Sequence, residues 1–147
     1  MLSIKFITDY NTKTLESVFD YKYKNKKIKV EKSSYSEFYK DLINIDQNKK
    51  TRIRYIEIEL SSLYKSISEK VIFNKNEIRT LRKNVLNLID LIIKSENKFH
   101  LSIISIFKNY RNFKNINSID FVDKIGRKSI EMEFNLILVK KLSKYKN

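Results

Sequence analysis

The predicted fold depends most on the stretch from Thr51 to Ile72, which reads TRIRYIEIELSSLYKSISEKVI. Apolar side chains recur in it at three- and four-residue steps, the spacing of one helical face. Its first nine residues also alternate apolar with polar side chains and are rich in β-branched types, as in a strand. We expect a helix, because the helical register covers the longer span. The apolar positions of that register are Ile53, Ile56, Leu60, Leu63, Ile67 and Val71.

The following stretch, from Asn76 to Glu96, carries a second and wider apolar stripe. Asn76 is the expected N-cap, because its side chain can accept a hydrogen bond from the first helical turn. Additional apolar positions flank the stripe, which is typical of a helix with much of its surface buried. The stripe consists of Ile78, Leu81, Val85, Leu88 and Ile92.

Two shorter segments also have helical spacing. Ser34 and Glu37 stand three residues apart, as in a capping box, and the apolar residues that follow fall on one face up to Ile45. A further helix is expected from Phe99 to Phe113, where aromatic and aliphatic residues recur at helical steps.

Both ends of the chain show alternation that is typical of strands. Residues 2–6 and 27–32 alternate on either side of a short helical pattern from Thr14 to Tyr23, which predicts a small β-hairpin beside a helix. Residues 129–142 fit a strand by strict alternation and a helix by spacing. Their length and the lysines at their end favour the helix, because cations suit the negative end of the helix dipole.

Taken together, these patterns predict a mostly α fold. The 147 residues suffice for one ordinary domain, and a hydrophobic fraction of 41% is enough to build a core. We expect a single helical domain over residues 1–147, a compact bundle of five to seven helices, with the small hairpin near the N-terminus as a possible addition. The helices of residues 51–72 and 76–96 would organise it.

The composition is strongly biased and excludes several kinds of site. The chain has no Ala, Pro, Cys or Trp and one Gly, Gly126, which is expected at a turn or helix end with positive φ. Without Cys there are no disulfides or zinc–thiolate sites, and one Gly cannot build a phosphate-binding loop. His100 is the single His, so we expect no metal and no cofactor. The bias toward Lys, Ile and Asn indicates a very AT-rich genome.

Two pairs of glutamates were candidates for a divalent cation site. Glu57 and Glu59, and likewise Glu131 and Glu133, would each point to one side only in a strand. In the expected helices, residues two apart diverge by about 200° around the axis, which separates the carboxylates. We therefore expect no enzymatic activity.

A net charge of +14 is the global property that points to a partner. Lysine side chains attract phosphate and release counterions, and tyrosine rings can stack on unpaired bases. The alternative is that the lysines follow from the genome's base composition alone. Two runs combine basic and aromatic residues, and their expected nucleic-acid-binding residues are Tyr21, Lys22, Tyr23, Lys24, Lys26, Lys27, Lys29, Lys108, Arg111 and Lys114.

The function expected from these features is non-enzymatic association with nucleic acid, either RNA or single strands. The alternative is a helical module, encoded by a virus or mobile element, that binds a host or defence protein with an acidic surface. No apolar run is long enough to span a bilayer, and no secretory signal is evident. We therefore expect no membrane insertion and a location in the cytoplasm or an organelle matrix, without secretion.

Overall fold

The computed structural model describes most of the chain, in ranges separated by gaps. The described residues are 2–8, 13–23, 28–32, 38–43, 53–65, 69–96, 99, 101–105, 107 and 118–145. The chain divides into two compact units. The first comprises Met1–Ile58 and Leu91–Ser105, and the second comprises Glu59–Asp90 and Ile106–Asn147. One domain over residues 1–147 stays a prediction.

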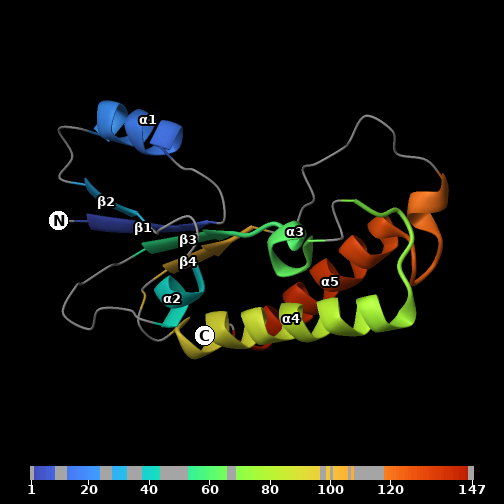
Figure 1. Cartoon of the computed structure of the whole chain (residues 1–147). Coiled ribbons are helices and arrows are strands. Elements are labelled where there is room, and N and C mark those ends of the chain that lie inside the picture. The colour runs from blue at the N-terminus through green and yellow to red at the C-terminus, as the bar shows by residue number, and fades with distance from the viewer. Residues whose placement is uncertain are drawn as a thin grey trace. The chain divides into compact units, whose positions relative to one another are not determined.

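The first unit is built on a four-stranded sheet with the strand order β2-β1-β3-β4 (Figure 1). Its strands are β1 (Leu2–Thr8), β2 (Ile28–Lys32), β3 (Ile53–Glu57) and β4 (Leu101–Ile104). All neighbouring strands run parallel. The predicted mostly α bundle of five to seven helices is therefore wrong. The cause is physical, because short buried strands leave apolar runs that fit a helix equally well.

The two N-terminal strands form a parallel pair instead of the predicted hairpin. Leu2 lies opposite Ile28, and the connection between β1 and β2 contains helix α1 (Lys13–Tyr23). A hairpin needs a loop of about two to five residues, whereas a chain that returns through a helix pairs in parallel. The predicted strands and helix are confirmed, and their pairing is wrong.

The two faces of this sheet carry different helices (Figure 1). On one face, the Phe6 ring packs against Phe19 of α1, with 5.6 Å between the ring centroids. On the other face, Lys5 Nζ lies 3.0 Å from Oδ1 of Asp41 in α2 (Phe38–Ile43). Neighbouring residues of a strand point to opposite faces, which explains how Lys5 and Phe6 contact different helices.

Residues 53–57 form strand β3, so the helix predicted over 51–72 is wrong there. Arg54, Ile56 and Ile58 are buried, whereas the residues between them are half-buried. This period of two is that of a strand. Of the predicted helix, the structure retains a short one, α3 (Leu60–Leu63). The local alternation prevails because β1 and β4 pair with β3 on either side.

Arg54 is fully buried in the sheet unit and bonded to several groups. Its Nε donates to Ser102 Oγ at 2.6 Å, and its Nη2 donates to the Ile92 carbonyl at 2.8 Å. The guanidinium also donates to Ser95 Oγ and to the Glu96 carboxylate. Burial lowers the pKa of Arg54, and the hydrogen bond to Glu96 opposes that shift. The arginine therefore ties β3 to β4 and to the segment that precedes β4.

Strand β4 also corrects the helix predicted from Phe99 to Phe113. Residues 101–104 pair in parallel with β3, with Ile53 opposite Leu101. Most of the remaining predicted helix, residues 108–113, lies outside the described residues. The capping box expected at residues 34–37 also lies outside them.

The described elements of the second unit are helical, and its longest helix is α4 (Lys75–Lys94), whose last turn belongs to the first unit. The helix predicted over residues 76–96 is confirmed. Four residues of its predicted stripe are buried: Leu81, Val85, Leu88 and Ile92.

Asn74 caps this helix, and the predicted N-cap Asn76 is wrong by two positions. The Glu77 N–H donates to Asn74 Oδ1 at 3.0 Å, and the Asn74 N–H donates to Glu77 Oε2 at 2.9 Å. This reciprocal pair is a capping box. The carboxylate of Glu77 also accepts a hydrogen bond from Lys70, and these contacts lower the pKa of Glu77.

The second long helix of this unit is α5 (Arg127–Leu142), which confirms the helix favoured over residues 129–142. A short 3₁₀ turn, Ser118–Phe121, precedes it, and another, Ser143–Tyr145, follows it. One face of α5 is buried through Ile130, Phe134 and Leu138.

Gly126 stands directly before α5, and its predicted positive φ is wrong. Its φ is −75° and its ψ is 145°, values open to any residue. Glycine is required here for lack of space instead, because a Cβ would lie 2.4 Å from the carbonyl oxygen of Asp120 and 2.7 Å from the Val122 nitrogen. The nearby positive φ, 63°, belongs to Lys124.

Candidate functional site

Four of the ten predicted nucleic-acid-binding residues lie in the described part of the chain. Tyr21, at the end of α1, is 90% exposed, and Lys22 and Lys29 are exposed as well. Tyr23 is half-buried, because its ring packs on Phe19 with 5.5 Å between centroids. Only Tyr21 of these two rings is therefore free to stack on a base.

The contacts of the two described lysines are weak. Lys22 Nζ lies 5.9 Å from the centre of the Tyr23 ring, and Lys29 Nζ lies 4.0 Å from a carboxylate oxygen of Glu31. The other six predicted residues lie outside the described residues: Lys24, Lys26, Lys27, Lys108, Arg111 and Lys114. Of the predicted residues, Tyr21, Lys22 and Tyr23 thus lie in the last turn of α1, and Lys29 lies on β2.

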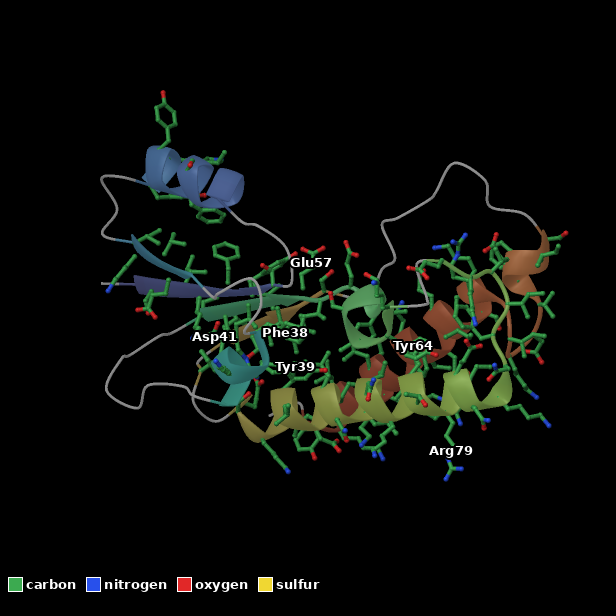
Figure 2. The ribbon with its side chains drawn as sticks, in the orientation of Figure 1. Phe38, Tyr39, Asp41, Glu57, Tyr64 and Arg79 are labelled. Atoms are coloured by element: carbon green, nitrogen blue, oxygen red, sulfur yellow. The ribbon has the colours of Figure 1, made fainter. Side chains whose placement is uncertain are left out.

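A basic stripe that the sequence analysis missed runs along α4. Lys75, Arg79 and Lys83 are exposed and stand four residues apart, so successive members rise about 6 Å and turn about 40°. Figure 2 shows Arg79 extending away from the helix into solvent. No carboxylate among the described residues forms an ion pair with the stripe. The two carboxylates of α4 pair with other lysines, Glu77 with Lys70 and Asp90 with Lys141. Counting cations at four-residue steps in the predicted helix would have found it.

The strand order places a topological switch point between β1 and β3. The chain leaves β1 for α1, which packs on the face that carries Phe6. Arg54 of β3 lies opposite Lys5 and therefore faces the other side, where it contacts Ile92 in the segment that leads into β4. Connections that leave neighbouring strands toward opposite faces open a crevice at the carboxyl ends of those strands.

Thr8 and Glu57 stand at this switch point. They are register partners at the carboxyl ends of β1 and β3. Thr8 is buried, Glu57 is half-buried, and Figure 2 shows Glu57 where β3 leaves the sheet. The Tyr55 hydroxyl donates to Glu57 Oε2 at 2.7 Å, and the Tyr55 ring packs 5.7 Å from that of Phe6. The Tyr55 hydroxyl thus orients the Glu57 carboxylate, and the packing of the Tyr55 ring against Phe6 fixes Tyr55 on the face of the sheet.

The chemistry of this edge is that of hydrogen-bond acceptors. An ionised carboxylate only accepts, and a hydroxyl both donates and accepts. A negative charge at the edge disfavours phosphate and other anions, in agreement with the absence of a glycine-rich loop. The sequence did single out Glu57, as half of a cation site with Glu59. Thr8 had no signal of its own, because a threonine ending a strand is unremarkable until the strand order is known.

The glutamate pairs considered for a divalent cation are engaged separately. Glu59 accepts from the Ser61 hydroxyl at 2.7 Å. On α5, Glu131 accepts from Lys128 at 2.8 Å, whereas Glu133 pairs with Arg82. Within the described residues, no group of three or more His, Asp or Glu side chains is arranged to hold a metal ion. His100 lies outside the described residues.

None of the described helices is both long and apolar enough to cross a membrane. Comparison of the chain with protein-family models, curated proteins and solved structures finds no match.

Proposed function

We propose that the sheet unit binds a small neutral or cationic molecule that carries hydroxyl or amino groups. The observation that carries this proposal is the pairing of Thr8 with Glu57 at the point where the strand order reverses. Ligands of open parallel sheets bind at the carboxyl ends of the strands, at such a switch point. The proposed activity is binding, and no catalytic step is assigned to it.

The ligand class follows from the groups at the edge. A ligand hydroxyl or amine donates to the Glu57 carboxylate, which Tyr55 orients through its hydroxyl at 2.7 Å. The buried Thr8 hydroxyl lies beside it in the same face, because the two residues are register partners in parallel strands. The rings of Phe6 and Tyr55 supply the apolar floor below them.

Glycerol, ribose and ethanolamine, added separately, are expected to shift the amide NMR signals of Thr8 and of residues 56–58, and acetate is not. The Glu57→Gln variant is expected to weaken ethanolamine binding by about 10-fold or more, because a hydrogen bond to a charged group contributes about 1.5–3 kcal/mol. NMR titration measures both effects.

Glu31→Gln is the matched control, since it removes the same charge from β2, whose residue 31 lies opposite Lys5 on the other face. It should leave binding unchanged. Equal losses in the two variants, or no shifts with any of the three probes, would contradict the proposal.

A second candidate function is the association with nucleic acid expected from the charge of +14. It is favoured by the α4 stripe, where Lys75, Arg79 and Lys83 are exposed in a row. Such a stripe can contact successive phosphates of a single strand without reading its bases. The exposed Tyr21 of α1 offers a ring that can stack on a base.

Neutralising the stripe with Lys75→Gln, Arg79→Gln and Lys83→Gln together is expected to weaken binding of a mixed-sequence single-stranded RNA. The slope of log affinity against log salt should fall by about 2, because each phosphate contact to a single strand contributes about 0.7. Fluorescence anisotropy at several salt concentrations measures the slope.

The control triple is Lys65→Gln, Lys94→Gln and Lys144→Gln, three exposed lysines whose loss changes the net charge equally. The slope should change less in this triple than in the stripe triple. If the two triples behave alike, the stripe is not the binding surface. If the unaltered chain binds no RNA at low salt, this second function is wrong.

A further inference from the structure

One face of the sheet is covered over β1 and β2 and exposed over β4. Helix α1 packs on Phe6 of β1 and against β2 (Figure 1). Leu101 and Ile103 of β4 belong to the same face, because their register partners in β3 are Ile53 and Tyr55. They are 50% and 47% exposed. Parallel sheets are normally covered on both faces, so apolar side chains left exposed on one of them are unusual.

The two edge strands of the sheet differ on this face. Ile28 and Val30 of the edge strand β2 are half-buried there, whereas Leu101 and Ile103 of the opposite edge strand, β4, are exposed. Exposed edge strands normally carry charged residues, especially lysine. The exposed positions of β4 instead carry side chains that suit contact with an apolar group.

The strand register places this exposed surface next to the Thr8–Glu57 pair. Phe6, Tyr55 and Ile103 are successive register partners in β1, β3 and β4, so their side chains form one row across the face. Phe6 is buried, Tyr55 is half-buried and Ile103 is exposed, so exposure rises along the row toward β4. Thr8 and Glu57 form the next row toward the carboxyl ends of the strands. The polar pair and the exposed apolar residues are therefore parts of one continuous surface.

Ile103 lies within reach of a molecule bound to Glu57. Neighbouring strands are about 4.8 Å apart and residues rise about 3.3 Å along a strand, which puts the Cα atoms of Glu57 and Ile103 about 8 Å apart. Leu101 continues the surface two residues farther along β4. Because α1 covers the other end of the row, a ligand held by Glu57 can extend an apolar group toward β4.

We infer that the ligand of this site is a primary amine with an apolar chain, and that the chain lies on Ile103. This inference rests on the proposed function and narrows it. The ammonium group donates to the Glu57 carboxylate, whose two oxygens retain acceptor sites beyond the bond from Tyr55. The chain then crosses Tyr55 toward Ile103 and Leu101 and removes these side chains from water, which favours binding in proportion to the apolar area covered.

Two amines of different length test the apolar contact. Ethylamine and hexylamine are both expected to shift the amide NMR signals of Thr8 and residues 56–58, and hexylamine also those of Leu101–Ile104. Hexylamine should bind about 10-fold more tightly, because its four additional methylene groups are partly removed from water. Hexanoate should shift neither set of signals, since its carboxylate is repelled by that of Glu57.

The ratio of the hexylamine affinity to the ethylamine affinity separates the two parts of the site. Ile103→Thr should lower this ratio to about threefold or less, because it removes apolar surface while keeping a β-branched residue in the strand. Glu57→Gln should weaken both amines and preserve the ratio. Val18→Thr is the matched control, since Val18 is 56% exposed on α1, and its ratio should equal that of the unaltered chain.

The outcomes distinguish this inference from the proposed function. Equal affinities for the two amines, or a ratio that Ile103→Thr leaves unchanged, would overturn the inference and leave the proposed function standing. If neither amine shifts the signals of Thr8 and residues 56–58, or if hexanoate shifts them as hexylamine does, both are wrong.

Discussion

Replacing Arg54 by Ala is expected to lower the stability of the sheet unit by about 3 kcal/mol, within the range for large-to-small substitutions in a core. The side chain is fully buried in β3, and its guanidinium lies 4.5 Å from the centre of the Phe99 ring. Removing it leaves a cavity and deletes the bonds to Ser95, Ser102 and the Ile92 carbonyl. The cavity and the lost hydrogen bonds both lower the stability of the sheet unit.

Arg54→Met separates these two causes. Methionine restores much of the volume, and two of the groups that lose the arginine keep other hydrogen bonds. The Ser102 hydroxyl donates to Glu96 at 3.0 Å, and the Ser95 hydroxyl donates to the Leu91 carbonyl at 2.9 Å. We therefore expect a smaller loss, about 1–2 kcal/mol, close to the value of the deleted hydrogen bonds.

Urea titration followed through the amide NMR signals of the strands measures the loss within the sheet unit itself. Arg79→Ala and Arg79→Met are the controls, because Arg79 is exposed on α4 and surface substitutions usually change stability by less than about 0.5 kcal/mol. If Arg54→Ala proves as harmless as Arg79→Ala, the buried network contributes nothing to the stability of the unit.

The second large effect is expected at Gly126, where Ala should destabilise the second unit by about 3 kcal/mol, at the upper end of the usual cost of overpacking. The added Cβ would lie 2.4 Å from a backbone carbonyl oxygen of Asp120. That oxygen cannot turn aside as a side chain would. Relief requires moving the turn that carries Asp120, which is itself buried and ion-paired with Arg127 at 2.9 Å.

A second effect of the Gly126→Ala substitution opposes the clash, so it is informative whether the variant is more or less stable than the unaltered chain. The backbone of Gly126, with φ of −75°, suits alanine, and such a substitution alone would stabilise by about 0.4–1 kcal/mol through the unfolded chain. The clash outweighs this gain. Thermal unfolding of Gly126→Ala beside Ser129→Ala, in the first turn of the same helix, measures the difference. A gain in stability for Gly126→Ala would show that the close approach does not exist.

The sequence predicted the local elements better than their assembly. The alternation near the N-terminus indicated both β1 and β2, and helical spacing indicated α1 and α4. The hairpin was wrong, although the length of α1 already favours a parallel return through a crossover. The helix predicted over the residues of β3 was wrong. Ile53 and Ile56 are three residues apart, which fits a helical face, although both also lie in a stretch that alternates as a strand does.

Two features of the sequence misled for reasons that the structure explains. Arg54 is a charged residue that a pattern of polar and apolar positions places outside, yet it is buried and bonded. The strict alternation from Ile130 to Leu138 imitates a strand because α5 is apolar on both faces, with Met132 and Leu136 outward. The ambiguity of the pattern thus follows from the apolar residues on the exposed face of the helix.

Sequence patterns could not predict that Thr8 and Glu57 form one site. Thr8 and Glu57 are far apart in the chain and meet only through the register of β1 with β3. The α4 stripe, in contrast, lies within one helix and could have been found from spacing alone.

The amino-acid sequence by itself determined several short-range features of this protein: strands β1 and β2, helices α1, α4 and α5, the exclusion of thiol and glycine-loop chemistry, and the basic charge. These depend on neighbours within a few residues, whose spacing decides which side chains share a face. Only the tertiary structure decided the strand order β2-β1-β3-β4, the burial of Arg54 and the need for glycine at position 126. Each of these is a contact between distant segments, and its free energy exists only once the chain has folded.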